Sequence, residues 1–248
     1  MAKGKDRIDR VLVARGLADT RSRAQSLLSA GKVRVRGQLV HRPATTVAND
    51  AEISIADDPG YVSRGGLKLA GALADLTLSP AGMVVADIGA STGGFTDCVL
   101  RNGALRVYAL DVGHGQLHPS LRADPRVINL EGNNARELHA DSLPERVGLV
   151  VVDASFIGLA KLLPALRTLL LPEGRILALV KPQFEVGPER VGKRGVVQDD
   201  GLRNEALAGV IAAAAELGLV CLRHAQCRLA GPEGNREIFA LFGQDTAS

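Results

Sequence analysis

The chain has few cysteines and no long apolar run, and these two absences exclude several classes of protein. Its 248 residues include three cysteines, Cys98, Cys221 and Cys227, which have neither the even count of a disulfide framework nor the close pairs of a zinc site. No stretch of about eighteen residues is apolar and free of charge, as a membrane-spanning helix would require. The N-terminal segment is charged and has no apolar stretch behind it, unlike a signal peptide. We therefore expect a cytoplasmic protein that does not insert into a membrane.

Positive charge is concentrated at the N-terminal end of the chain, although the net charge is only +3. Residues 1–42 contain 11 Lys and Arg against 3 Asp and Glu, whereas the remaining residues contain 19 against 24. Such a basic segment is typical of nucleic-acid binding. The alternative is an ordinary solvated surface, because this segment has no aromatic side chain to stack on a base.

The basic segment has the pattern of a small α+β unit. Apolar residues at helical spacing predict a helix over residues 7–16, and Thr20 and Gly31 are suited to begin and end a second helix. Arg21 and Arg23 fall in the first turn of the second helix, where the helix dipole disfavours positive charge, so an external phosphate would best explain them. Alternating residues then predict short strands at 32–37, 39–40 and 52–55.

The rest of the chain alternates strands and helices, which predicts a mostly parallel sheet covered on both faces. The apolar runs predict strands that end at Asp87, Asp111, Asp153 and Lys181. We expect helices at 65–76, 95–101, 159–171 and 202–217, followed by an antiparallel pair of strands at 219–228 and 237–242. A chain of this length and 46% hydrophobic content can form one such domain and a smaller one.

The glycine-rich stretch from Ala86 to Phe95 predicts a site for a nucleoside cofactor, because it follows an apolar strand and can open a helix. A dinucleotide fingerprint needs a second glycine where this chain has Ser91, so NAD is disfavoured. The acidic Asp87 and the small loop residues suit S-adenosylmethionine, which is cationic and has no phosphate. Asp111, 22 residues beyond Gly89, is placed to accept from ribose hydroxyls. The alternative is a structural turn that binds nothing.

Two charged residues stand where apolar strands stop, which is where ligands bind in an open α/β sheet. Asp153 follows one run and Lys181 follows another. An amine partly removed from water favours its neutral form and can then accept a proton. The structural alternatives are that Asp153 caps a turn through Ser155 and that Lys181 extends from the surface to solvent.

Several motifs give the chain a resemblance to a known family. The stretches SRGGLKLAGAL, DIGASTGGFTDC, DVGHGQL, VDASFIGL, LVKPQFEVG, VGKRGVV and GNREIF occur in order, and together they resemble the TlyA family of FtsJ-like methyltransferases. Two helices followed by GKVRVRG, over about residues 6–57, resemble the S4 RNA-binding module.

The resemblance implies a fold, an activity and a partner. It implies a Rossmann-like class I S-adenosylmethionine-dependent methyltransferase sheet with a small N-terminal α+β RNA-binding domain. The expected division is an S4-type domain over residues 1–58, a linker at 59–62 and a methyltransferase domain over 63–248. The implied enzyme transfers a methyl group from S-adenosylmethionine to a cytidine ribose 2′-hydroxyl in 16S rRNA, 23S rRNA or both, and its partners are ribosomal subunits.

The resemblance also implies the site residues. It implies a catalytic tetrad of Lys68, Asp153, Lys181 and Glu237, with Lys181 as the general base. Methyl transfer of this kind requires no metal. The expected cofactor residues are Asp87, Gly89, Ala90, Ser91, Thr92, Gly93, Gly94, Phe95, Asp111, Glu131 and Asn134, the last two near the adenine. The expected RNA-binding residues are Arg7, Arg10, Arg21, Arg23, Lys32 and Arg34 in the S4-type module and Arg64, Lys193 and Arg194 beside the catalytic centre.

Two other functions are alternatives for this sequence. A ribosome-assembly factor that keeps the fold without catalysis would be expected to have lost the tetrad, and the tetrad is intact. The family is also named for haemolysis, a membrane-active role that the absence of a signal peptide, a membrane-spanning run and a long basic amphipathic helix disfavours.

Overall fold

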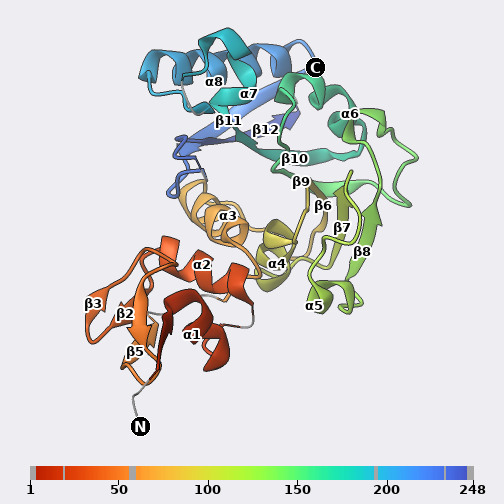
Figure 1. The fold of residues 1–248 in the computed structure, drawn as a ribbon. Helices are drawn as coiled ribbons and strands as arrows, with labels where there is room; N and C mark the ends of the chain where they lie inside the picture. The colour runs from red at the N-terminus through yellow and green to blue at the C-terminus, as the bar shows by residue number, and fades with distance from the viewer. Residues whose placement is uncertain (1–3, 19, 56–59, 193–194, 232, 245–248) are drawn as a thin grey trace. The chain divides into compact units, whose positions relative to one another are not determined.

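The computed structural model describes residues 4–18, 20–55, 60–192, 195–231 and 233–244, so Lys193 and Arg194 lie outside the described residues (Figure 1). The chain forms two compact units, residues 1–64 and 65–248. In the described part of the chain, none of the helices combines the length and the apolar character needed to cross a bilayer.

The N-terminal unit contains the two predicted helices, α1 (Ile8–Ala14) and α2 (Arg21–Ser29). The Thr20 hydroxyl accepts a hydrogen bond from Arg23 N, which confirms the predicted cap. The predicted strands form an antiparallel sheet of β3 (Gln38–Leu39), β2 (Val33–Val35) and β5 (Ile53–Ile55). The sequence patterns did not predict a second pairing, between β1 (Lys5–Arg7) and β4 (Thr46–Ala48).

The C-terminal unit is built on a seven-stranded sheet. Its order is β11-β12-β10-β9-β6-β7-β8, with β12 antiparallel to both its neighbours and the other pairs parallel. The strands are β6 (Val84–Ile88), β7 (Arg106–Asp111), β8 (Val127–Glu131), β9 (Val147–Val152), β10 (Leu170–Val180), β11 (Leu219–Gln226) and β12 (Ile238–Gln244). The parallel sheet and the closing antiparallel pair were both predicted.

Helices cover both faces of this sheet (Figure 1). Alternate strand residues such as Ile88, Val152 and Val180 form one core with residues of α6 and α8, and Figure 1 shows α3 and α4 on the other side. The helices of this unit are α3 (Arg64–Asp75), α4 (Gly94–Arg101), α5 (Pro119–Arg122), α6 (Leu163–Thr168), α7 (Pro182–Glu185) and α8 (Asp200–Ala215), with short 3-10 turns η1 (Ala135–Glu137), η2 (Leu159–Lys161) and η3 (Pro188–Arg190).

The prediction of one helix over residues 159–171 is wrong. The segment divides into η2 and α6, and Leu170 already belongs to β10. Pro164 has no backbone N–H to continue a helical turn, so it lies in the first turn of a new helix. Leu170 is buried and pairs with Val147 of β9, and this sheet contact overrides the helical spacing of the leucines.

The strand order determines where a ligand can bind. The parallel strands follow the sequence outward in both directions from the centre, so β6 and β9 are neighbours although five elements separate them in the chain. In open α/β sheets the connections diverge at such a switch point and leave a crevice beyond the carboxyl ends of the strands. The carboxyl ends of β6, β7, β9 and β10 lie within one residue of Asp87, Asp111, Asp153 and Lys181, as predicted.

Candidate active site

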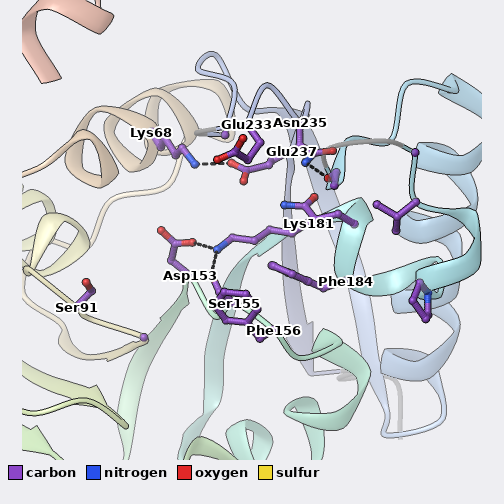
Figure 2. Close-up of a pocket in the computed structure, with 17 residues that line it drawn as sticks. Lys68, Ser91, Asp153, Ser155, Phe156, Lys181, Phe184, Glu233, Asn235 and Glu237 are labelled. Atoms are coloured by element: carbon purple, nitrogen blue, oxygen red, sulfur yellow. Dashed lines mark hydrogen bonds and ion pairs between the residues drawn. The ribbon is translucent and has the colours of Figure 1, made fainter. Parts of the chain in front are cut away.

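Four buried or partly buried charged side chains meet in two pairs beyond the carboxyl edge of the sheet. Lys68 of α3 forms an ion pair with Glu237, which immediately precedes β12. Lys181 follows β10, and its Nζ lies 2.6 Å from Asp153 Oδ1 and 2.7 Å from Ser155 Oγ, to which it donates a hydrogen bond. Figure 2 shows each lysine directed toward its acidic partner. Tertiary structure therefore brings together four residues from distant parts of the chain.

The two pairs line a single cavity of about 880 Å³. Lys68, Lys181 and Glu237 are 7%, 8% and 1% exposed, so little water competes for their contacts. Lys181 Nζ and Asp153 Oδ1 form an ion pair, and the hydrogen bond that the Lys181 ammonium donates to Ser155 Oγ helps to orient it. The two lysines and the two carboxylates around this cavity balance each other's charge.

A second cavity, of about 470 Å³, occupies the switch point between β6 and β9. It shares Gly89, Ser91, Asp153, Ser155 and Phe156 with the tetrad cavity, so a molecule in one cavity borders the other. Of the predicted cofactor residues, Gly89, Ser91, Asp111 and Asn134 line it directly. Its walls also contain residues that the sequence patterns did not single out, including Val112, Gln116, Ala135, Ile157 and Leu162.

The glycine turn is shaped by close backbone approaches. Gly89 has φ of +80°, and a Cβ there would lie 2.9 Å from the carbonyl oxygen of Asp153. Gly93 has φ of +92°, and its Cβ would overlap the side chains of Leu117 and Leu121. Gly94 and Phe95 begin α4 and are buried, as is Ala90, so these predicted residues support the loop from behind, whereas Thr92 is exposed.

Asp111 and Glu131 both bind backbone amides of the loops around the second cavity. Asp111 accepts hydrogen bonds from Ser91 N at 2.8 Å and from Gly113 N at 2.7 Å. Hydrogen bonds from the backbone amides of Gly115, Leu117 and Gln116 lower the pKa of Glu131 to about 2. Each carboxylate oxygen can accept a second hydrogen bond, so Asp111 can still contact a ribose hydroxyl. Glu131 does not line the cavity, and its contact with adenine stays a prediction.

The residues of the second cavity fit S-adenosylmethionine. Asp87 is fully buried under the glycine turn, where Thr96 donates to its Oδ2 at 2.6 Å while its Oδ1 has no partner among the described residues. Desolvation raises the pKa of Asp87 to about 7, against the opposing hydrogen bond from Thr96. A cationic ligand nearby would stabilise this carboxylate, and the apolar Val112, Ile157 and Leu162 suit an adenine ring.

The Asp87 environment predicts a pH dependence of cofactor binding. The pKa of Asp87 in the folded protein is above its ordinary value, so ionising this buried carboxyl costs stability. The free energy of unfolding of the ligand-free protein therefore falls as pH rises from about 4 through 7. A cation binds the ionised form, so affinity for S-adenosylmethionine is expected to rise roughly tenfold between pH 6 and pH 8. Calorimetry at both pH values measures this, and Asp87→Asn is expected to remove the pH dependence. An unchanged pH dependence in that variant would show that another group is responsible.

The predicted RNA-binding residues of the N-terminal unit are partly held by internal contacts. Arg7 Nη2 and Arg21 Nη2 lie 3.1 and 2.9 Å from Oδ2 of the buried Asp9. Burial alone would raise the pKa of Asp9, but hydrogen bonds from Arg7, Arg21 and Gln25 outweigh it and lower that pKa. Asp9 therefore supplies Arg21 with an internal anion, so the place of Arg21 in the first turn of α2 does not by itself require an external phosphate.

The other predicted cations of this unit have different surroundings. Arg10 lies 3.7 Å from Asp6, and Arg34 donates to the carbonyl oxygen of Gly37 at 3.0 Å. Arg23, Lys32 and Arg64 each have interactions within the protein. All six basic residues of the S4-type module stay predictions as RNA contacts, as does Arg64.

Asn235, within the GNREIF motif, forms hydrogen bonds with Gly195 and Val197 and so holds this segment at one wall of the tetrad cavity. Its Oδ1 accepts from Val197 N at 2.9 Å, and its Nδ2 donates to the Gly195 carbonyl at 2.8 Å. Asn235 is buried and lines the cavity. Gly192 and Gly195 also line the cavity. The motif drew attention to this residue, but only the fold shows which segment it holds.

Substituting Asn235 by leucine is expected to lower the free energy of unfolding by about 1–3 kcal/mol, because Val197 N–H and the Gly195 carbonyl lose their partners. Hydrogen exchange of the Val197 amide should accelerate, and denaturant unfolding gives the energy. Asn235→Asp is the matched control, since it keeps the acceptor for Val197 N and removes the donor. Equal exchange rates in wild type and the leucine variant would contradict this role.

Phe156 is another site residue that the sequence patterns did not single out. It lies three residues after Asp153 and borders both cavities, with 92% of its surface exposed and φ of +66°. Its ring rests against Phe184, with centroids 5.4 Å apart (Figure 2). A bulky residue rarely adopts this backbone conformation, which concentrates at functional sites. The available signal was an aromatic residue within the VDASFIGL motif of an aromatic-poor chain.

The fold of the C-terminal unit is shared with solved methyltransferases of low sequence identity. The N-methyltransferase NodS of Bradyrhizobium japonicum superposes with a TM-score of 0.53 over 73% of this chain and 97% of that protein, at 16% identity. The sheet, the glycine turn and the cavity at the switch point therefore have the arrangement of a Rossmann-like class I methyltransferase fold.

Sequence comparison identifies the family within that class. The profile of the FtsJ-like methyltransferases matches residues 61–244, and that of the S4 domain matches residues 6–53. The chain is 47% identical over 235 residues to the 16S/23S rRNA (cytidine-2′-O)-methyltransferase TlyA of Mycobacterium tuberculosis, covering 94% of this chain and 88% of that one. A Streptococcus thermophilus protein named as a haemolysin is 38% identical, with a TM-score of 0.76 over 99% and 90% of the two chains. The chain belongs to the FtsJ-like methyltransferase family and, within it, to the TlyA group.

Proposed function

We propose that the protein is a ribosomal RNA 2′-O-methyltransferase that uses S-adenosylmethionine to methylate a cytidine ribose in 16S rRNA, 23S rRNA or both. The observation that carries this proposal is the joining of two cavities, one lined by the tetrad and one at the switch point of a methyltransferase sheet. The name of the relative from Mycobacterium tuberculosis supports the substrate. The enzyme would act in the cytoplasm, on ribosomal subunits.

The cofactor would occupy the switch-point cavity. Gly89, Ser91 and Asp111 would hold it directly, while Asp87 would balance its positive charge from beneath the glycine turn. The proposed supporting residues behind the turn are Ala90, Thr92, Gly93, Gly94 and Phe95, and Glu131 and Asn134 would fix the loops on the adenine side. When bound, S-adenosylmethionine supplies an electrophilic methyl group on a cationic sulfur.

The tetrad would prepare the ribose hydroxyl for attack. In its neutral form, Lys181 accepts the 2′-hydroxyl proton at Nζ, and Asp153 and Ser155 then hold the resulting ammonium. Lys68 and Glu237 form the facing pair and would position the nucleotide from the opposite wall of the cavity. Phe156 would support the base of the target nucleotide, because bases stack on aromatic rings. No step requires a metal.

The two units would divide binding and catalysis between them. We propose residues 1–58 as an S4-type RNA-binding domain, 59–62 as a linker and 63–248 as the methyltransferase domain. Electrostatic contacts of the basic module with phosphates would provide affinity, and the second domain would select the nucleotide. Lys193 and Arg194, with Arg64, are proposed to hold RNA phosphates near the catalytic centre.

Transfer of labelled methyl groups to purified 30S subunits, 50S subunits and naked rRNA tests the function. We expect label on a ribose 2′-oxygen, identified by nuclease digestion and mass spectrometry, in at least one of these substrates. Absence of transfer to every RNA, despite measurable cofactor binding, would favour the ribosome-assembly function instead. Lysis of erythrocytes by the pure protein would revive the membrane-active alternative.

A further inference from the structure

The side chain of Gln116 lines the switch-point cavity and has no role in the mechanism above. Three side-chain amides border this cavity, those of Gln116, Asn133 and Asn134. Both asparagine amides form hydrogen bonds within their own turn, at distances of 2.8–3.3 Å. The Gln116 amide has no hydrogen-bond partner within the described part of the chain. It is therefore the amide that remains available to a ligand in this cavity.

A glycine brings the Gln116 amide close to the carboxylate of Asp111. The backbone of Gly113 is not left-handed, so its conformation does not require a glycine. The space around it does, because a Cβ at Gly113 would overlap the amide nitrogen of Gln116 and would lie 3.2 Å from Asp111 Oδ1. Both polar atoms therefore lie within 3.2 Å of one point, which only a residue without a side chain leaves open.

Glu131 holds the backbone of Gln116 in this position. Its carboxylate accepts hydrogen bonds from the backbone amides of Gly115, Gln116 and Leu117, at 2.8, 2.9 and 3.2 Å. Leu117 is buried, whereas Gln116 itself is exposed. The backbone is therefore fixed at and around Gln116, while the side chain remains free to meet a ligand.

We propose that Gln116 binds the ribose hydroxyls of the cofactor together with Asp111. Each ribose hydroxyl can donate one hydrogen bond and accept others. The ionised Asp111 carboxylate can only accept, whereas the amide nitrogen of Gln116 donates, so the two side chains complement each other on the diol. Glu131 is a positioning residue that acts through the backbone of Gln116. The inference rests on the proposed function and deepens it, because it assigns a donor to a ribose site that otherwise has an acceptor.

Substituting Gln116 by leucine in the full-length chain tests this role. The ligand for calorimetry is S-adenosylhomocysteine, which has the same adenosine as the methyl donor and cannot react. We expect its dissociation constant to rise about fivefold, the usual effect of one lost hydrogen bond. Gln226→Leu is the matched control and should not change the constant, since Gln226 is exposed on β11 and does not line this cavity.

Ligand analogues identify the group that Gln116 contacts. Wild type is expected to bind an analogue without the two ribose hydroxyls at least about tenfold more weakly than S-adenosylhomocysteine. The Gln116→Leu variant should lose roughly fivefold less from the same change, because its share of the contact is already gone. An analogue with oxygen in place of the adenine amino group should weaken both proteins equally. Equal losses from removal of the hydroxyls, or unequal losses from the adenine change, would overturn the proposal.

The Gly113→Ala variant gives a second test, because its methyl group displaces the Gln116 amide. We expect it to bind S-adenosylhomocysteine at least as weakly as Gln116→Leu does, and the two substitutions together should cost less than the product of their separate effects. Independent effects would contradict the shared space. If wild type binds neither S-adenosylmethionine nor S-adenosylhomocysteine, the proposed function itself fails. That result is distinct from a wild type that binds both beside an unaffected Gln116→Leu variant, which would overturn this inference alone.

Discussion

Replacing Lys181 by alanine is expected to lower kcat for methyl transfer by about 10²–10⁴-fold, the usual contribution of a positioned general base. Lys181 Nζ lies within reach of both Asp153 and Ser155 at the carboxyl end of β10, where few other groups could accept the ribose proton. Affinity for S-adenosylmethionine should change less than twofold, because Lys181 lines the tetrad cavity and not the switch-point cavity.

Single-turnover transfer of labelled methyl groups to saturating RNA measures this effect without interference from product release. Ser155→Ala is the graded companion: it removes the hydroxyl that orients the ammonium and should cost far less than loss of the amine. Arg126→Ala, which removes a surface arginine that pairs with Asp124, should leave kcat unchanged. If Lys181→Ala retained more than about a tenth of wild-type kcat, Lys181 would not be the base, and Lys68 would become the candidate.

Removal of residues 1–58 is expected to weaken RNA binding roughly 100-fold or more at about 0.15 M salt while leaving cofactor binding within twofold. The first 42 residues contain 11 of the 30 Lys and Arg residues of the chain, so their removal takes away much of the positive charge. The switch-point cavity is lined only by residues of the C-terminal unit, so cofactor binding should be kept. The C-terminal unit has its own buried core, so it is expected to remain folded without the N-terminal one. Filter binding of RNA across a salt series, with calorimetry of the cofactor, measures both effects.

A charge-reversed full-length chain provides the control for this truncation. Arg10→Glu with Arg34→Glu changes two side chains that lie outside the Asp9 network, so the fold of the unit should be kept. We expect an intermediate loss of RNA affinity and a smaller salt slope. A parallel loss of RNA and cofactor binding on truncation would contradict the division of labour between the two units.

The sequence predicted most of the architecture, because the hydrophobic pattern reflects burial on one or both faces of an element. The ends of four parallel strands were placed within one residue, and the closing pair β11 and β12 was recognised. The pattern failed where a tertiary contact competed with local preference, as at Leu170, which pairs with Val147 instead of continuing a helix. The pairing of β1 with β4 also escaped prediction, since each strand has only three residues.

The sequence also predicted which residues belong to the candidate site better than it predicted their surroundings. The motifs shared with the TlyA family implied a tetrad of Lys68, Asp153, Lys181 and Glu237. The structure places all four residues around one cavity. Motifs did not reveal Phe156, because its significance depends on a left-handed backbone and on exposure beside both cavities. They also gave no sign that Asp9 of α1 holds Arg7 at the end of β1 and Arg21 at the start of α2.

By itself, therefore, the sequence determined the class of fold, the family and the kinds of side chain present at the site. These follow from periodicity, from the glycine turn and from motifs that are local in the chain. Only the tertiary structure decided which lysine pairs with which carboxylate, which loop Asn235 holds and where the two cavities join. The physical reason is that such contacts join residues up to 169 positions apart, and their geometry depends on the packing of the whole sheet and its helices.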